Sequence, residues 1–366
     1  MSRQNALPSS KWNCLLLFSL RGLSFSAFSS SSSQPETEEV AEVDLPNCSA
    51  YIGTAQTAEV GPSLLRKSTL KRSIQLSFLV AIIVCFVILL TPCQAAVGDA
   101  VPKHLMVTRG NVSIDVIAQD AGPIIVILPS LGRGAEDYDI VAARLSADGF
   151  RVLRPQVRGV GASTGPMAKL TLHDYAADVA MVIEHESKGP VLVVGHAFGN
   201  FVARVLATDR PELVRGIVLA AASAGKVPTG VHELPVSPEV REAINKSGDL
   251  SLSDAERLPY LQRAFFAPGH DPHVWLTGWH PEVMKAESAA EAATPVDDFF
   301  ACGKARVLDL QAENDAVAPR KFAGVLKAAL GDRVTVVVIP HAGHALVPEQ
   351  PQAVAKAIEA FSRTLQ

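Results

Sequence analysis

The sequence predicts an α/β protein whose mostly parallel sheet is covered by helices on both faces. From about residue 104, short apolar runs rich in β-branched residues alternate with segments of helical character. Runs such as 124–128 and 191–195 are continuously apolar, which is typical of strands buried on both faces. The alternation is interrupted at about 226–300. We therefore predict one α/β domain over 97–366 with an inserted cap at about 226–300.

The elements are expected in a regular order. Residues 104–120 should form an antiparallel hairpin, because two alternating runs flank the turn residues Gly110 and Asn111. Later strands are expected at 124–128, 151–154, 191–195, 216–221, 305–311 and 333–339. Helices are expected at 136–148, 171–187, 198–209, 319–330 and 350–363.

The interruption at 226–300 is rich in proline and holds two of the chain's three tryptophans. A structureless loop of this length is uncommon inside a compact domain, so we predict a small helical cap between two strands. Trp275 and Trp279 are one helical turn apart. They are expected either to pack inside the cap or to line an apolar pocket, and we take them as candidate substrate-binding residues.

Composition and charge limit the classes of partner. The chain carries 33 Lys and Arg against 37 Asp and Glu, a formal net charge of -4. No basic stripe is present, which excludes nucleic acid and leaves a small-molecule substrate or ligand. No glycine-rich nucleotide-binding loop follows a strand, so no cofactor is expected. Pro272 separates His270 from His273, so no metal site is expected there. The oligomeric state stays open.

The first 96 residues differ from the rest of the chain. Residues 1–65 contain a serine run and few periodic apolar positions, which predicts a disordered segment or an extension upstream of the true start. Within 66–96, basic residues precede the uncharged apolar run 74–90, and small residues follow it. This pattern predicts a signal peptide and export to the periplasm or medium. An uncleaved membrane anchor through 74–90 is the alternative.

Five segments of the domain carry recognisable motifs. Residues 195–199 read Gly-His-Ala-Phe-Gly, the frame of a nucleophile elbow with Ala197 in place of serine. The other segments are the loop 129–132, the Arg-Gly-x-Gly-x-Ser stretch 158–163, Asp315 followed by Pro319, and 341–344 ending in His344. In this order they resemble the α/β-hydrolase-fold superfamily, most closely its capped esterases, C–C hydrolases and haloperoxidase-like members. The resemblance covers the chain from about residue 104 and implies the α/β-hydrolase fold.

The resemblance implies a role for each site residue. His344 would act as a general base oriented by Asp315, with Glu313 as the nearest rival for the acid. The backbone N–H groups of Leu131 and Phe198 would form an oxyanion hole. Ala197 stands at the nucleophile position and offers no hydroxyl.

Two further residues of these motifs receive smaller roles. Ser130 is a candidate substrate-binding residue and an alternative source of a hydroxyl. His196 is expected to pack beneath the elbow.

Several functions are compatible with such a site. One is hydrolysis of a small apolar ester, amide or C–C substrate without the serine. A second is nucleophile-independent chemistry, as in lyases or cofactor-free oxygenases. A third is a non-catalytic protein that binds an apolar ligand, and a fourth is an inactive Ser→Ala variant. The substrate is not specified by the sequence.

Overall fold

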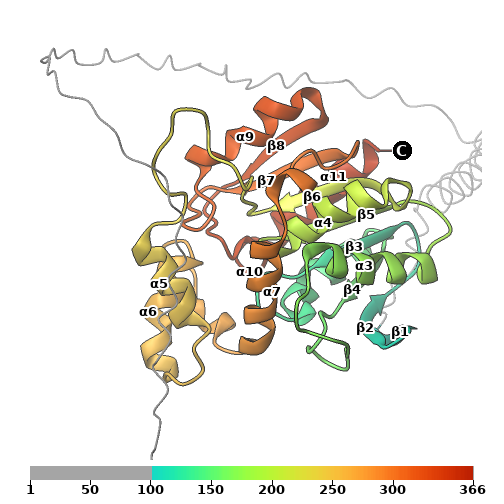
Figure 1. The fold of residues 1–366 in the computed structure, drawn as a ribbon, viewed down its shortest axis with the longest axis horizontal. Coiled ribbons are helices and arrows are strands. Elements are labelled where there is room, and N and C mark those ends of the chain that lie inside the picture. The colour runs from blue at the N-terminus through green and yellow to red at the C-terminus, as the bar shows by residue number, and fades with distance from the viewer. Residues whose placement is uncertain (1–100, 366) are drawn as a thin grey trace, which may run out of the picture. The chain divides into compact units, whose positions relative to one another are not determined.

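A computed structural model describes residues 101–365 (Figure 1). The segments 1–65 and 66–96, with the predicted signal or anchor at 74–90, lie outside the described residues. One sheet of eight strands has the order β1-β2-β4-β3-β5-β6-β7-β8. Between residues 101 and 365, no helix combines the length and the apolarity needed to cross a bilayer.

The sheet opens with the predicted hairpin. Strand β1 (Lys103–Arg109) pairs antiparallel with β2 (Val112–Gln119), in a register that places Arg109 opposite Val112. Gly110 adopts φ +61 in the turn, a conformation that glycine reaches at little cost. Because β2 also pairs antiparallel with β4, the hairpin forms one edge of the sheet.

The remaining strands confirm the predicted parallel sheet. They are β3 (Ile124–Leu128), β4 (Arg151–Pro155), β5 (Val191–His196), β6 (Val214–Ala220), β7 (Arg306–Ala312) and β8 (Val334–Ile339). Adjacent members of this set pair parallel. Every residue of the central strand β5 is buried, as its unbroken apolar run predicts.

Helices cover both faces of the sheet (Figure 1). One face carries α2 (Asp139–Ala147) and α11 (Pro351–Arg363). The other carries α3 (Leu172–Glu186), α4 (Phe198–Asp209) and α9 (Arg320–Leu330). The predicted helix at 136–148 begins instead with a 3-10 turn, η1 (Ala135–Tyr138), whose first N–H, that of Ala135, donates to the Gln156 side chain at 2.8 Å.

Between β6 and β7 the chain forms a group of helices, drawn in yellow and orange in Figure 1 and called the cap below. These are α5 (Pro238–Ser247), α6 (Asp254–Ala264), η3 (Pro272–Trp275), α7 (Pro281–Ala293) and α8 (Val296–Phe299). Several of its prolines occupy the first turn of a helix, where the missing N–H has no partner to lose. The cap has a small core of its own around Leu261, Phe265 and Trp275.

Short elements complete the fold. They are η2 (Pro211–Leu213), η4 (Gly331–Arg333) and α10 (Leu346–Glu349). The loops that follow β3, β5, β7 and β8 all leave from the carboxyl ends of parallel strands. Such strand ends share one edge of the sheet, which is where α/β proteins bind their ligands. Leu131, Ala197, Asp315 and His344 lie at these strand ends, whereas Trp275 and Trp279 lie between β6 and β7.

Candidate active site

Ala197 occupies a sharp, strained corner between β5 and α4. Its backbone adopts φ 47 and ψ -110, a region that costs a non-glycine residue about 1–3 kcal/mol. A Cβ at Gly195 would lie 2.3 Å from the Gly199 carbonyl oxygen, and one at Gly199 would lie 2.5 Å from that of Leu128. Both ends of the motif therefore require glycine. Ala197 itself is half-buried between fully buried neighbours, as an elbow residue facing a site should be.

His344 and Asp315 form a buried pair. His344 Nδ1 lies 3.0 Å from each carboxylate oxygen of Asp315. Asp315 Oδ1 also accepts the N–H groups of Val317 at 2.8 Å and Ala318 at 2.7 Å, which fixes the carboxylate after β7. The nearest rival, Glu313, instead accepts the backbone N–H of His341. With its proton on Nδ1, His344 keeps Nε2 as a basic nitrogen.

His196 lies beneath the elbow and is fully buried. Its Nε2 is 2.8 Å from the carbonyl oxygen of His344, which can only accept, so Nε2 carries the proton. Nδ1 then accepts from the Tyr138 hydroxyl at 2.8 Å. That hydroxyl accepts the Ser130 N–H at 2.9 Å. Burial lowers the pKa of His196 to about 3. A neutral His196 thus ties the loop after β3 to the loop of His344.

The N–H groups of Leu131 and Phe198 are available to a ligand. Neither has a hydrogen-bond acceptor among residues 101–365. Phe198 begins α4, so its N–H points out of the positive end of a helix dipole. Leu131 is half-buried in the loop 129–134. This loop carries one N–H group of the predicted oxyanion hole and is called the oxyanion loop below. Ser130 in the same loop is buried, and its N–H is already held by Tyr138.

The cap holds the oxyanion loop through Gly132. The Gly132 carbonyl accepts the N–H of His280 at 2.9 Å, and its N–H donates to Glu287 Oε2 at 2.6 Å. A Cβ at position 132 would lie 2.7 Å from Met284 Cβ. Only glycine permits this contact, so α7 packs directly on the backbone of the loop.

The two cap tryptophans enclose an arginine of the oxyanion loop. Arg133 lies 4.8 Å from the ring centres of both Trp275 and Trp279. It also forms a two-pronged ion pair with Asp137, with both N···O distances at 2.7 Å. Both indoles are buried in the cap core. They fasten the cap to the loop here, and their contact with a substrate stays a prediction.

A second carboxyl fastens the cap to the loop of His344. Glu349 on α10 accepts the N–H of Gly343 at 2.6 Å and the N–H of Ala267 at 2.6 Å. The Ala345 N–H donates to the Phe265 carbonyl at 2.8 Å. Burial raises the pKa of Glu349. The backbone on either side of His344 is therefore held, at Gly343 by Glu349 and at Ala345 by the cap.

A model of the alpha/beta hydrolase family matches residues 125–357, more than half of the chain. The chain belongs to the alpha/beta hydrolase family. The match begins in β3 and ends in α11, so it includes the elbow, Asp315, His344 and the cap.

Individual relatives of this family are distant. The chain is 28% identical over 124 residues to a 2-(acetamidomethylene)succinate hydrolase of Mesorhizobium japonicum, covering 33% of this chain and 44% of that enzyme. It is 25% identical over 273 residues to a bifunctional esterase/perhydrolase of Acinetobacter calcoaceticus, covering 69% and 97%. The chain spans less than half of the length of the first curated relatives it matches.

Solved structures show the same architecture. An esterase from Exiguobacterium antarcticum has a TM-score of 0.60 at 18% identity, over 72% of this chain and 100% of the other. A thermophilic esterase from Thermogutta terrifontis has a TM-score of 0.57 at 22% identity, over 72% and 99%. At these identities the likeness shows the fold alone.

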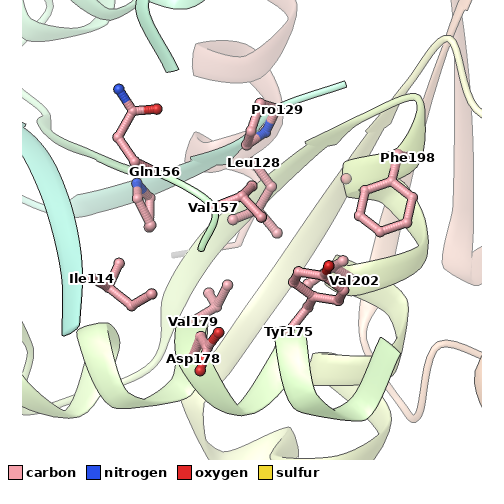
Figure 2. A pocket seen from close by; sticks show the side chains of 12 residues that line it. Ile114, Leu128, Pro129, Gln156, Val157, Tyr175, Asp178, Val179, Phe198 and Val202 are labelled. Carbon is pink, nitrogen blue, oxygen red and sulfur yellow. The ribbon is translucent and has the colours of Figure 1, made fainter. Parts of the chain in front are cut away.

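A small apolar cavity lies next to the elbow helix (Figure 2). Its volume of about 30 Å³ is that of one or two water molecules. Leu128, Val157, Tyr175 and Phe198 contribute to its wall, and the Tyr175 and Phe198 rings meet edge to face at 5.8 Å. Neither His344 nor Asp315 lines it. The cavity is too small for an ester substrate.

No metal-binding cluster of three or more His, Cys, Asp or Glu side chains occurs within residues 101–365. His270 Nε2 is 2.8 Å from the His341 carbonyl oxygen, to which it donates. His273 Nδ1 lies 2.5 Å from Asp271 on the surface. Both imidazoles thus have partners in the protein.

Three residues of the site have no sequence motif. Tyr138, Glu287 and Glu349 each bind a backbone group of a site loop that is distant in the chain or belongs to another element. Glu287 looks like an ordinary polar residue of an alanine-rich helix. A residue whose partner is 155 positions away leaves no local pattern to read.

Proposed function

We propose that this protein hydrolyses a small apolar ester, amide or C–C substrate without a serine nucleophile. The observation that carries the proposal is the buried His344–Asp315 pair, whose free Nε2 is held at the same sheet edge as the elbow. The pair and the two N–H groups supply a base and an anion site. The names of the relatives, an esterase/perhydrolase and a hydrolase of an acetamido compound, support acyl transfer to water.

In the proposed reaction, water replaces the serine hydroxyl. His344 Nε2 removes a proton from a bound water as its oxygen attacks the substrate carbonyl. The carbonyl oxygen becomes negative and is stabilised by the N–H groups of Leu131 and Phe198. The tetrahedral intermediate then expels the leaving group, to which His344 donates the proton that it took from water. Asp315 remains ionised and stabilises the imidazolium between the two steps.

The missing hydroxyl has a kinetic consequence. Ala197 cannot form an acyl-enzyme, so the acyl group passes directly to water. In a serine protease, removing the nucleophile lowers turnover by a factor of about 10⁶, and the residual activity comes from binding and the oxyanion hole. We therefore expect slow turnover, and activated esters are the most suitable test substrates.

The test compares turnover of 4-nitrophenyl acetate by the wild type, Ala197→Ser and His344→Ala. We expect His344→Ala to abolish the wild-type rate. Ala197→Ser should raise the rate by about 100-fold or more and become labelled by a fluorophosphonate, because it restores the nucleophile. Glu313→Gln is the matched control and should keep the wild-type rate. A His344→Ala rate equal to that of the wild type would refute the proposal.

A second function uses the same base. Since Ala197 leaves a base and an anion site without a nucleophile, His344 can instead remove a proton from the substrate itself and leave an anion in the hole. Such a lyase or oxygenase would lose turnover with His344→Ala but change little with Ala197→Ser. A bound ligand without turnover in any of these proteins would indicate a non-catalytic binding protein.

A further inference from the structure

The position of the Leu131 N–H depends on the hydrogen bonds of its two flanking peptide groups. The peptide that carries this N–H is fixed on its oxygen side, where the Ser130 carbonyl accepts the Arg133 N–H at 3.1 Å. The following peptide is fixed by the cap, because its Gly132 N–H donates to Glu287 Oε2 at 2.6 Å. Glu287 is thus the side chain that holds this part of the loop from α7.

The surroundings of Glu287 do not suit a charged carboxylate. The residue is 0% exposed, and its other oxygen, Oε1, has no partner among the described residues. The titratable groups that face it are Glu291 on α7, Tyr175 on α3 and Tyr138 on η1. None of these is basic, and the nearby Arg133 is paired with Asp137. A fully buried charge with one hydrogen bond and no cation is costly, whereas a neutral acid is tolerated.

We propose that Glu287 is a positioning residue of the oxyanion hole: from the cap it fixes the loop that presents the Leu131 N–H, and it does so as an uncharged acid. Oε2 accepts the Gly132 N–H, and Oε1 carries the proton. The cap is then part of the anion site as well as its cover. The consequence for anion binding rests on the proposed function, whereas the positioning of Gly132 does not.

The protonation state of Glu287 controls what the hole can bind. Burial raises the pKa of Glu287 to about 8. Below that pH the loop is held by a neutral group, and the hole keeps its positive character. As the pH rises through this pKa, Glu287 becomes ionised. Its carboxylate, which contacts Gly132 next to Leu131, then repels an anion bound in the hole. Anion affinity should therefore be highest below about pH 8 and fall above it.

The positioning claim is tested by amide hydrogen exchange in residues 129–134 at about pH 7. Glu287→Gln keeps an acceptor of the same shape, Glu287→Ala removes it, and Glu291→Gln changes an exposed carboxyl on the same helix. We expect Glu287→Ala to exchange at Gly132 about tenfold faster or more. Glu287→Gln and Glu291→Gln should match the wild type. Equal protection in all four proteins would overturn the positioning role.

The protonation claim is tested with butane-1-sulfonate, whose charge does not change with pH. We expect its affinity for the wild type to fall about tenfold between about pH 6.5 and about pH 9.5. Glu287→Gln has no charge at this position at any pH, so its affinity should fall less than that of the wild type over the same range. This comparison does not require Glu287→Ala to fold. The same pH dependence in both proteins would overturn the uncharged acid.

An infrared measurement separates failure of this inference from failure of the proposed function. Sulfonate that binds none of the proteins would argue against the anion site and hence against the proposed function. The difference spectrum between the wild type and Glu287→Gln should still show the carboxyl band of a protonated acid at about pH 7, and this band should be lost above about pH 9. If this band is missing at about pH 7, Glu287 is ionised and the inference is wrong.

Discussion

The two N–H groups of the proposed oxyanion hole are held by different means. Phe198 is placed by local structure, because β5 turns into α4 through Ala197 within a few residues. Leu131 is placed from a distance, because its loop is bound by Glu287, 155 residues away from Gly132. The first half appears in the sequence as a motif even without its serine. The second half depends on a cap that shares no motif with it.

The turn between β5 and α4, which places the Phe198 N–H, should lose the most stability when a side chain is added to one of its glycines. In Gly199→Val, the new Cβ would lie 2.5 Å from the Leu128 carbonyl oxygen, so backbone must move. We expect a loss of about 3 kcal/mol or more in the free energy of unfolding, measured by urea denaturation. Gly324→Ala is the control, since nothing lies within 4 Å of its Cβ, and it should stabilise α9 by roughly 0.5–1 kcal/mol. Wild-type stability in Gly199→Val would show that the turn is not tightly packed.

The contact between the cap and the oxyanion loop, which places the Leu131 N–H, should weaken when Arg133 is replaced. Arg133→Leu separates the two indoles from their cation and leaves the half-buried Asp137 without its partner. We expect the free energy of unfolding to fall by about 3 kcal/mol. Tryptophan fluorescence should shift to the red as Trp275 and Trp279 become exposed to solvent. Arg144→Leu on α2, an exposed position, should change neither measurement. An unshifted fluorescence spectrum in Arg133→Leu would mean that the cap is held by its other contacts.

The smallest effect concerns the strain at the elbow itself. Glycine adopts the backbone angles of Ala197 at little cost, so Ala197→Gly should relieve strain. This gain should offset the greater entropy that glycine gives the unfolded chain. We expect stability within about 0.5 kcal/mol of the wild type or above it. Ala143→Gly, at an exposed position of α2, should lose about 1 kcal/mol. Equal losses at both positions would show that Ala197 carries no strain.

Local interactions likewise account for the parts of the fold that the sequence predicts. Strand and helix bounds agree within a few residues, because apolar runs such as Ile124–Leu128 and helix ends near proline are local signals. The alternation of these elements predicts the parallel sheet correctly. The 3-10 turn before α2 is missed, and so is the Gln156 side chain from the loop after β4 that accepts its first N–H.

The candidate site divides in the same way. Its motif residues lie at the carboxyl ends of parallel strands, and their order along the chain already predicts these positions. Tyr138, Glu287 and Glu349 are found only in three dimensions, because each binds a backbone group and any polar side chain of suitable length meets that need. Sequence patterns therefore indicate the candidate base and the elbow, while the supports of the loops require the structure.

The proposed use of water in place of serine is tested most directly by burst kinetics with a 4-nitrophenyl ester. An acyl-enzyme releases a first equivalent of nitrophenol quickly, whereas direct attack by water releases it at the steady rate. We expect no burst from the wild type and a burst approaching one equivalent from Ala197→Ser. Adding His344→Ala to either protein should abolish its release of nitrophenol. A burst from the wild type would contradict direct attack by water, because it would reveal another nucleophile, with Ser130 the first to examine.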